Sequence, residues 1–178
     1  HYNIPVNVYG LSTNALSMDL QNGYERALNA ILPALAGADE LSGVGELAAG
    51  VTGSLAQMVV DDELTAAVRR AIRGFTVDAN SLAVEVIDQA MQGSRNFLEQ
   101  PHTLRTLRSG ELLVTRLAER GSWSEWERRG KPDLALRAQE RADMLLTQHQ
   151  PLPLDIDQEK ELDRIYQHAV QEIAARIL

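Results

Sequence analysis

The chain of 178 residues contains no cysteine. This absence excludes a disulfide framework and any thiolate chemistry, whether nucleophilic or metal-binding. The chain also lacks an apolar run that approaches the roughly 18 residues of a membrane-spanning helix. Its first ten residues, HYNIPVNVYG, have neither the basic start nor the long apolar core of a signal peptide. We therefore expect no membrane span and a cytoplasmic protein.

Positive charge is scarce, since 17 Lys and Arg stand against 25 Asp and Glu, which gives a formal net charge of −8. Such a balance disfavours broad electrostatic attraction to nucleic acid or to anionic lipid. Neither is an expected partner. Hydrophobic residues make up 44% and charged residues 24% of the chain, a composition typical of one globular core.

Sequence motifs for metal, nucleotide or nucleophilic chemistry are missing. The segment GVGELAAG is too loose for a dinucleotide fingerprint, and no P-loop and no Gly-x-Ser-x-Gly nucleophile elbow is present. The histidines form no H-x-x-x-H pair for a metal; they are His1, His102, His149 and His168. We therefore assign no metal ligand and no catalytic residue.

The first β/α unit is predicted from residue type and spacing. Residues 4–10 (IPVNVYG) predict a short strand, because β-branched and aromatic residues favour extended backbone. A helix should run from about Asp19 to a stop at Gly37, with its last turn loosened by Pro33. Its apolar face is expected to carry Leu20, Tyr24, Ala27, Leu28, Ile31, Leu32 and Leu35.

A second β/α unit follows in residues 38–53 and beyond. A short apolar run predicts a buried strand over 39–44, and the glycines after it predict a flexible loop. Ser54 and Gln57 have the spacing of a capping box, so a helix should start there and end at Gly74. Its buried side is expected to carry Leu55, Met58, Val59, Val68, Ala71 and Ile72.

Strands that alternate with helices over the first 75 residues predict parallel β/α units. Two such units cannot close a sheet, because both edges and both faces need neighbours. The chain also starts at His1, without a methionine, and soon enters an apolar run. We therefore expect a piece of a longer protein; tag removal or N-terminal processing is the alternative.

The remaining residues predict helices. One should cover 81–91, and Ser122 with Glu125 forms a capping box for a short helix. A further helix should run from Pro132 to about His149, with Leu134, Ala138, Ala142 and Leu145 on its buried face. After a proline-rich connector, the last helix carries Leu162, Ile165, Tyr166, Ala169 and Ile173.

Three local patterns have more than one reading. The acids of VVDDEL (59–64) point about 100° apart on a helix, so they cannot converge as a pair, and we expect them on a solvated face. Trp123 and Trp126 share a helical face and should pack as aromatics rather than form a cation cage. Salt links to neighbouring carboxylates are expected for a basic edge made of Arg69, Arg70 and Arg73.

Polar residues directly after the two strands are the candidate site. In β/α barrels, functional groups lie at the carboxyl ends of strands. The residues in question are Tyr9, Ser12, Thr13 and Asn14 after the first strand, and Gly43, Gly45 and Glu46 after the second. Without a barrel, ordinary loop polarity and helix capping would explain them.

An ordered series of segments resembles the trimethylamine methyltransferase family, including its non-pyrrolysine relatives that demethylate quaternary amines such as glycine betaine. The segments are PVNVYGLST, DLQNGYERAL, LAGADELSGVGEL, SLAQMVVDDEL, HTLRTLR, WERRGKPDLALRAQERADMLL and PLPLD. The resemblance spans nearly all of the chain.

This resemblance implies an α/β fold, the C-terminal part of a TIM (β/α) barrel of roughly 450 to 500 residues. Residues 1–75 would be the last two β/α units, and residues 76–178 a helical C-terminal extension packed on the barrel, with the N-terminal part of the protein absent. The implied activity is related to methanogenesis and moves a methyl group from a methylated amine to the cobalt of a partner corrinoid protein. The corrinoid (cobalamin) belongs to that partner, and no cofactor is bound directly.

The expected substrate is inferred from the presence or absence of pyrrolysine in family members. Members that act on trimethylamine contain pyrrolysine, whereas this sequence shows only standard residues, so a quaternary amine is the expected substrate. We also expect a homo-oligomer. A helical scaffold protein without activity, or a catalytically inactive barrel relative, remains the alternative.

A quaternary ammonium ion carries charge but no hydrogen-bond donor, so aromatic faces and carboxylates hold it. Tyr9 is predicted to supply the face and Glu46 the charge, with Ser12 and Asn14 as further substrate-binding candidates. The alternatives are a packed aromatic for Tyr9 and a solvated acid for Glu46.

The lone His102 lies near the start of a helical stretch, after Pro101. In the family the HTL segment follows the barrel. We therefore expect His102 to bond main chain and to pin the extension to the barrel; a role in the site is the alternative. Leu104 and Leu107 should pack inward.

Overall fold

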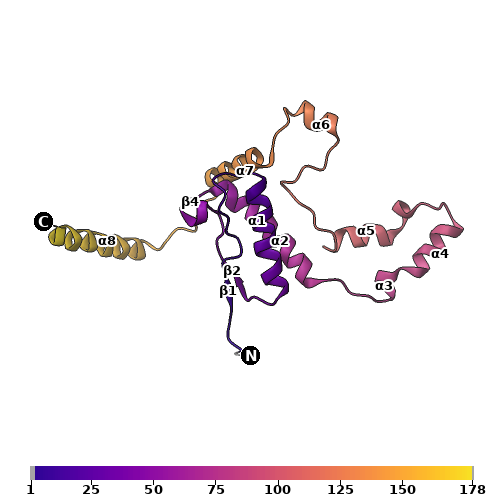
Figure 1. The fold of residues 1–178 in the computed structure, drawn as a ribbon, viewed down its shortest axis with the longest axis horizontal. Helices are drawn as coiled ribbons and strands as arrows, with labels where there is room; N and C mark the ends of the chain where they lie inside the picture. The colour runs from indigo at the N-terminus through magenta and orange to yellow at the C-terminus, as the bar shows by residue number, and fades with distance from the viewer. Residues whose placement is uncertain (1–2, 178) are drawn as a thin grey trace. The chain divides into compact units, whose positions relative to one another are not determined.

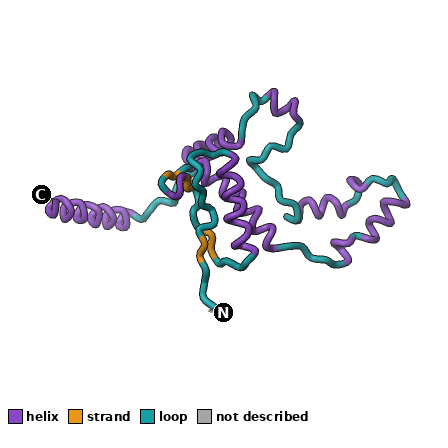
Figure 2. Tube along the Cα trace, in the orientation of Figure 1, coloured by secondary structure: helices purple, strands orange, loops and turns teal. Residues whose placement is uncertain are grey.

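The computed structural model describes residues 3–177 and divides into two compact units, His1–Met144 and Leu145–Leu178. Figures 1 and 2 show that helices dominate and that the strands are short. The starting residue His1 and the two outer ends of the predicted domains 1–75 and 76–178 lie outside the described residues. The predicted boundary at residue 75 stays a prediction.

The parallel strand pair is confirmed. Strand β1 (Asn7–Val8) pairs in parallel with β2 (Glu40–Leu41), with Asn7 opposite Glu40 and Val8 opposite Leu41. Helix α1 (Leu20–Leu35) connects them, so the order strand, helix, strand is that of a β/α unit. Both strands are shorter than predicted, and β2 is exposed to half-buried rather than buried.

The glycine-rich loop after β2 contains a hairpin, which the sequence interpretation did not predict. Strand β3 (Glu46–Leu47) pairs antiparallel with β4 (Thr52–Gly53) across the 3-10 turn η1 (Ala48–Gly50). The turn is held because Ala48 N donates to Ala15 O and Ala49 N donates to Thr13 O, each at 2.9 Å. The loop after β1 therefore fixes the hairpin that follows β2.

Helix α1 starts where predicted, since the Asp19 side chain accepts from Asn22 N, but it turns the other face inward. Its buried residues are Asn22, Arg26, Ala30 and Ala34. The small Ala30 and Ala34 side chains let the α1 backbone approach α2, and Arg26 pairs with Asp61 on α2. This face is therefore buried instead of the face that carries the leucines. The predicted apolar face is largely exposed, at Leu20, Tyr24, Leu28, Leu32 and Leu35.

Helix α2 (Leu55–Arg73) begins at the predicted cap, where Ser54 Oγ accepts from Gln57 N, and ends at Gly74. Its buried residues are Ala56, Gln57, Asp61 and Val68. Val68 was predicted to be buried, whereas Leu55, Met58 and Ile72 are exposed. Between α1 and α2 (Figure 1) lies a core cluster of Leu11, Ala30, Ala34 and Val68, with Ile31, Leu41 and Leu64 against it.

The following helices are short. They are α3 (Ala79–Leu82), α4 (Val84–Gln92), the 3-10 turn η2 (Phe97–Glu99), α5 (Pro101–Arg108) and α6 (Trp123–Arg128). The single helix predicted over 81–91 is interrupted at Ala83, which has a left-handed backbone with φ 51°. On α5, Leu104 and Leu107 are exposed, contrary to expectation.

Helix α7 (Leu134–Gln148) buries Ala138 and Ala142, as predicted. Ala138 belongs to a second core cluster with Ala56 and Leu117, against which Met18, Val59 and Val60 pack. In the unit of residues 145–178, helix α8 (Ile156–Ile177) exposes Leu162, Ile165, Tyr166, Val170 and Ile173. No helix within residues 3–177 is long and apolar enough to cross a membrane.

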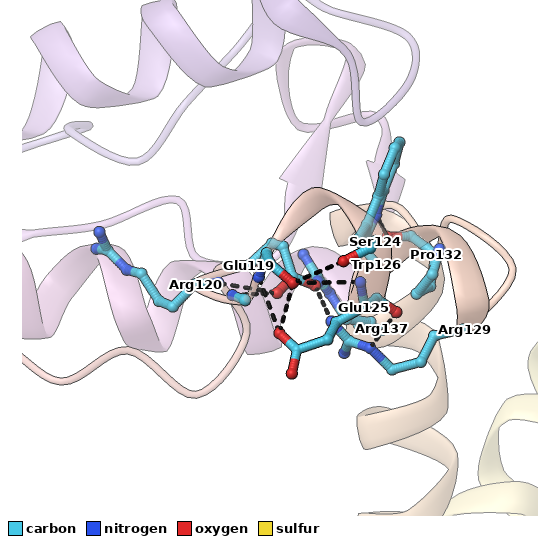
Figure 3. Close-up of polar contacts among 10 residues, drawn as sticks. Glu119, Arg120, Ser124, Glu125, Trp126, Arg129, Pro132 and Arg137 are labelled. Atoms are coloured by element: carbon cyan, nitrogen blue, oxygen red, sulfur yellow. Dashed lines mark hydrogen bonds and ion pairs between the residues drawn. The ribbon is translucent and has the colours of Figure 1, made fainter.

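Helix α6 is tied to α7 by a carboxylate (Figure 3). Both halves of the predicted capping box at Ser122 are present. Glu119 Oε2 accepts from Arg129 Nη2 at 2.6 Å and from Arg137 Nη1 at 3.0 Å. The pKa of Glu119 lies below its usual value, mainly because Gly121 N–H donates to the carboxylate, with Arg129 adding charge.

The aromatic pair differs from its prediction, whereas the basic edge agrees with its prediction at two arginines. The rings of Trp123 and Trp126 lie 4.9 Å apart, but Trp123 is 68% exposed and Lys131 Nζ lies 5.8 Å from its ring, so the pair is not the expected packed wall. The expected salt links of the basic edge are present for Arg70 and Arg73, which both pair with Glu111.

Candidate functional site

The loops that follow β1 and β2 lie together, which is the arrangement that the predicted site requires. Leu11 N donates to Ser42 O at 2.8 Å, and the bonds from Ala48 and Ala49 to the β1 loop add two more ties. Residues 9–15 and 42–50 therefore form one connected region.

A hollow of about 420 Å³ opens beside the β1 loop. One wall is apolar and comes from Leu28, Leu32 and Pro33 of α1. The rest of the lining contains four of the predicted residues together with Glu25, which the sequence interpretation missed; it consists of Val8, Tyr9, Ser12, Thr13, Asn14, Glu25 and Asn29. A ring, a carboxylate and an apolar wall face the same space.

The Glu25 carboxylate is fixed by the β1 loop. Its Oε2 accepts from Thr13 Oγ1 at 2.7 Å and from Asn14 N at 2.8 Å, and its Oε1 accepts from Gln21 Nε2 at 2.8 Å. The Thr13 hydroxyl, followed by Gln21 and the main chain, lowers the pKa of Glu25, so the group is charged at neutral pH. The only sequence signal for this role was the helical i, i+4 spacing of Gln21 and Glu25, which many solvated helices share.

Glu46 does not line this hollow but lies beside the Tyr9 hydroxyl. A Cβ built on Gly50 would stand 3.1 Å from Tyr9 Oη and 3.2 Å from Glu46 Oε2, so both oxygens border the same small space. Gly50 also has φ +86°, which a larger residue rarely adopts. Glu46 Oε2 is buried and finds no hydrogen-bond partner among residues 3–177. A buried carboxylate oxygen without a donor is costly, and a ligand cation beside it would relieve that cost.

A buried ion pair lies beneath these loops. Arg26 is 2% exposed and Asp61 0% exposed, with Arg26 Nη1 2.7 Å from Asp61 Oδ2. The solvated face expected for the acids of 59–64 is therefore wrong for Asp61. Burial lowers the pKa of Arg26 and raises that of Asp61, and the attraction between the two opposes both shifts.

The polar partners of the pair come from both helices and both loops. Asp61 Oδ1 accepts from Gln57 Nε2 at 2.8 Å, and Asp61 Oδ2 accepts from Gly45 N at 2.7 Å. Arg26 Nε donates to Asn22 Oδ1 at 2.7 Å, and Asn22 Nδ2 donates to Gln57 Oε1 at 2.6 Å. Arg26 also donates from Nη1 to Leu11 O and from Nη2 to Glu46 O. Of these residues, only Gly45 and Glu46 belonged to the predicted site.

His102 lies in a different part of the same unit. Its Nε2 is 2.9 Å from Asn80 O, and it lines a separate hollow of about 600 Å³ with Phe75, Leu82 and Arg105 among others. The expected contact with main chain is present, but Asn80 belongs to the predicted extension itself, so this bond does not join the extension to residues 1–75. The role of His102 stays a prediction. Within residues 3–177, no three His, Asp or Glu side chains are grouped so as to hold a metal ion.

Comparisons with known proteins agree on one family. The family model described as trimethylamine methyltransferase (MTTB) matches residues 1–174. A trimethylamine methyltransferase of Methanosarcina barkeri is 35% identical over 170 residues, which are 94% of this chain and 33% of that protein. One of Desulfitobacterium hafniense is 33% identical and covers 86% of this chain and 30% of the relative.

A glycine betaine methyltransferase of Desulfitobacterium hafniense is 27% identical over 155 residues, 86% of this chain and 32% of that protein. The chain therefore spans about a third of the length of the curated relatives that it matches. The family model covers nearly the whole chain, and the relatives agree with it over most of its length. The chain belongs to the trimethylamine methyltransferase family.

Proposed function

We propose that the protein containing this chain transfers a methyl group from a methylated amine to the cobalt of a partner corrinoid protein. Family membership supports the amine and the methyl transfer. The observation that carries the proposal within this chain is the hollow beside the β1 loop, where the half-exposed Tyr9 ring, the fixed Glu25 carboxylate and an apolar wall meet. Methylated ammonium groups combine charge with an apolar surface, and such a hollow offers a partner for each.

A quaternary ammonium is the substrate that we favour. Its charge is spread over methyl groups that cannot donate a hydrogen bond, so it needs an aromatic face and a nearby anion rather than an acceptor. Tyr9 supplies the face and Glu25 an anion whose acceptor sites are already used by Thr13, Asn14 and Gln21. Ser12 and Asn14, at the rim, would orient the remainder of the substrate, such as the carboxylate of a betaine.

Trimethylamine is the second candidate, and Glu46 favours it. Protonated trimethylamine carries one N–H, and Glu46 Oε2 is a buried acceptor without a donor among the described residues. The relatives named for trimethylamine are also more similar to this chain than the one named for glycine betaine. The two substrates therefore differ in which carboxylate they would use.

The chemistry assigns the chain a positioning role. When the methyl group leaves a quaternary ammonium, the nitrogen becomes a neutral amine. Carboxylates at the site bind the charged substrate more strongly than the neutral amine, and they thereby promote release of the amine product. The cobalt of the partner corrinoid would supply the electron-rich acceptor for the methyl group. Tyr9 and the leucines of α1 would exclude water on the nitrogen side.

The proposal includes the architecture and setting of the whole protein. We propose that residues 1–75 are the last two β/α units of a TIM barrel, that residues 76–178 form a helical extension, and that the protein is a cytoplasmic homo-oligomer. The parallel pairing of β1 and β2 around α1 supports the barrel, and the exposed Leu20, Tyr24 and Leu35 of α1, which do not line the hollow, support further packing partners.

Calorimetric titration of the full-length protein with tetramethylammonium, glycine betaine and trimethylamine tests the proposal. We expect binding of at least one amine, weakened in E25Q if it is a quaternary amine and in E46Q if it is trimethylamine, and unchanged in the control E85Q, an exposed acid of α4. Methyl transfer is then followed in the visible spectrum of the corrinoid protein. Wild-type protein that binds none of the three amines would leave the scaffold or the inactive relative as the better account.

A further inference from the structure

Arg26 is the largest fully buried side chain of the described residues, and it touches both loops of the candidate site. It donates to the main-chain oxygen of Leu11, two residues after Tyr9. It also donates to the main-chain oxygen of Glu46. One guanidinium therefore connects the segment that carries the ring to the residue that carries the unpartnered carboxylate oxygen.

Asp61 holds that guanidinium in place from the opposite side. Its Oδ2 accepts from Arg26 Nη1 and from Gly45 N, the residue directly before Glu46. Gln57, one turn earlier on α2, donates to Oδ1 of the same carboxylate. The main chain at residues 45 and 46 is thus fixed twice, at an N–H by Asp61 and at a carbonyl by Arg26.

We propose that Arg26 and Asp61 are positioning residues of the amine site, which set the Glu46 carboxylate beside the Tyr9 hydroxyl. This inference rests on the proposed function for the identity of the ligand, but the placement of Glu46 beside Tyr9 does not. Neither residue touches the ligand. A planar guanidinium with five fixed donors suits a position where two carbonyls and a carboxylate must be held at once.

The chain contains a matched control. Arg70 on α2 makes the same kinds of contact elsewhere, because it donates to Gly74 O, to Glu111 O and to the Glu111 carboxylate. Its loss removes two bonds to main chain and one ion pair, as the loss of Arg26 does in addition to its bond with Asn22, but at a partly exposed side chain whose partners are not residues of the candidate site. R70M therefore controls for the loss of an arginine that bonds main chain.

The first readout needs no ligand. Full-length protein with 3-fluorotyrosine at position 9 is measured by fluorine NMR, with and without E46Q. In the wild-type background E46Q should shift the resonance, because the carboxylate borders the same space as the Tyr9 hydroxyl. In R26M that shift should largely disappear, and in R70M it should persist. An equal shift in R26M and in wild type would overturn the inference.

The second readout is the dissociation constant of trimethylamine, the candidate substrate that would use Glu46. We expect R26M and E46Q each to weaken binding about tenfold and the double variant to weaken it little more, as for residues of one network. Additive losses would contradict a positioning role. D61N, which is isosteric and keeps an acceptor for Gly45 N, replaces R26M if that variant does not fold.

The two proposals fail in different ways. Wild-type protein that binds no amine but shows the Arg26-dependent fluorine shift would refute the proposed function and keep the positioning of Glu46. Amine binding together with a fluorine shift that is the same in R26M as in wild type would support the proposed function and refute the positioning of Glu46.

Discussion

Replacing Arg26 by methionine should be one of the most damaging single changes in this chain. Methionine fills much of the same volume but leaves Asp61, which is 0% exposed, without its counter-charge. Removing one partner of a buried ion pair typically costs about 3–5 kcal/mol, because the other charge stays buried. Whole domains are stable by only about 5–15 kcal/mol, so the loss is a large share.

The hydrogen bonds that Asp61 keeps in R26M determine how large the loss of stability is. Asp61 keeps Gly45 N and Gln57 Nε2, which soften the penalty. Against that, the carbonyls of Leu11 and Glu46 lose the Arg26 donor, and a buried acceptor without a partner costs about 1–3 kcal/mol. We therefore expect R26M to lower the free energy of unfolding by about 4 kcal/mol, near the middle of the buried-pair range.

Urea unfolding of the full-length protein measures this, together with D61N and the double variant R26M/D61N. Neutralising Asp61 in the R26M background removes the stranded charge, so the double variant should lose less than the sum of the single losses, by about 0.5–3 kcal/mol. A loss below about 1 kcal/mol for R26M, in the range of an exposed pair, would refute the reasoning. So would strict additivity at an unchanged denaturant slope.

Three further outcomes are expected. The lowered pKa of Glu119 means that the contacts of its carboxylate, chiefly the bond from Gly121 N–H and then the pair with Arg129, stabilise the fold above the usual carboxyl pKa of 4.5. This contribution is lost as the pH falls below that value, so the melting temperatures of wild type and E119Q should differ at neutral pH and converge in acid, and a gap that persists in acid would contradict this. H102N should cost about 0.5–1.5 kcal/mol through the lost contact with Asn80 and leave methyl transfer per folded molecule unchanged; lost transfer at an unchanged melting temperature would assign His102 to the site. Residues 1–178 expressed alone should self-associate through the exposed side of α1, and L35E should reduce this in light scattering, whereas a monodisperse wild-type monomer would argue against it.

Local signals predicted the elements well. The caps at Ser54 and Ser122 are present where their spacing placed them, because the side chain at the start of a helix bonds a main-chain N–H three residues later. Helix α1 also starts at the predicted residue, after Asp19. The parallel pair β1 and β2 followed from the alternation of strand and helix. These features depend on residues that are close in sequence.

Features that depend on distant partners were not predictable in the same way. The inward face of α1 is decided by Arg26 and Asp61, which are 35 residues apart, and a hydrophobic pattern assigns both to solvent. Glu25 and Gly50 acquire their places only when the β1 loop and the hairpin come together. The leucines of α1 follow the helical period, so the period predicts a shared face. The period does not predict which segment covers this face, and within the described residues it is exposed.

The central claim is that a methylated ammonium group binds at Tyr9, with Glu25 as the counter-charge for a quaternary ammonium or Glu46 for trimethylamine. Its most direct measurement is the crystal structure of the full-length protein soaked with tetramethylammonium or trimethylamine, paired with the calorimetric affinities of wild type, E25Q and E46Q. The account predicts a cation in the hollow lined by Tyr9 and Glu25 or in the space beside Gly50 and Glu46, with affinity lost in the matching variant. A bound amine that touches neither place, with affinities unchanged in both variants, would contradict it.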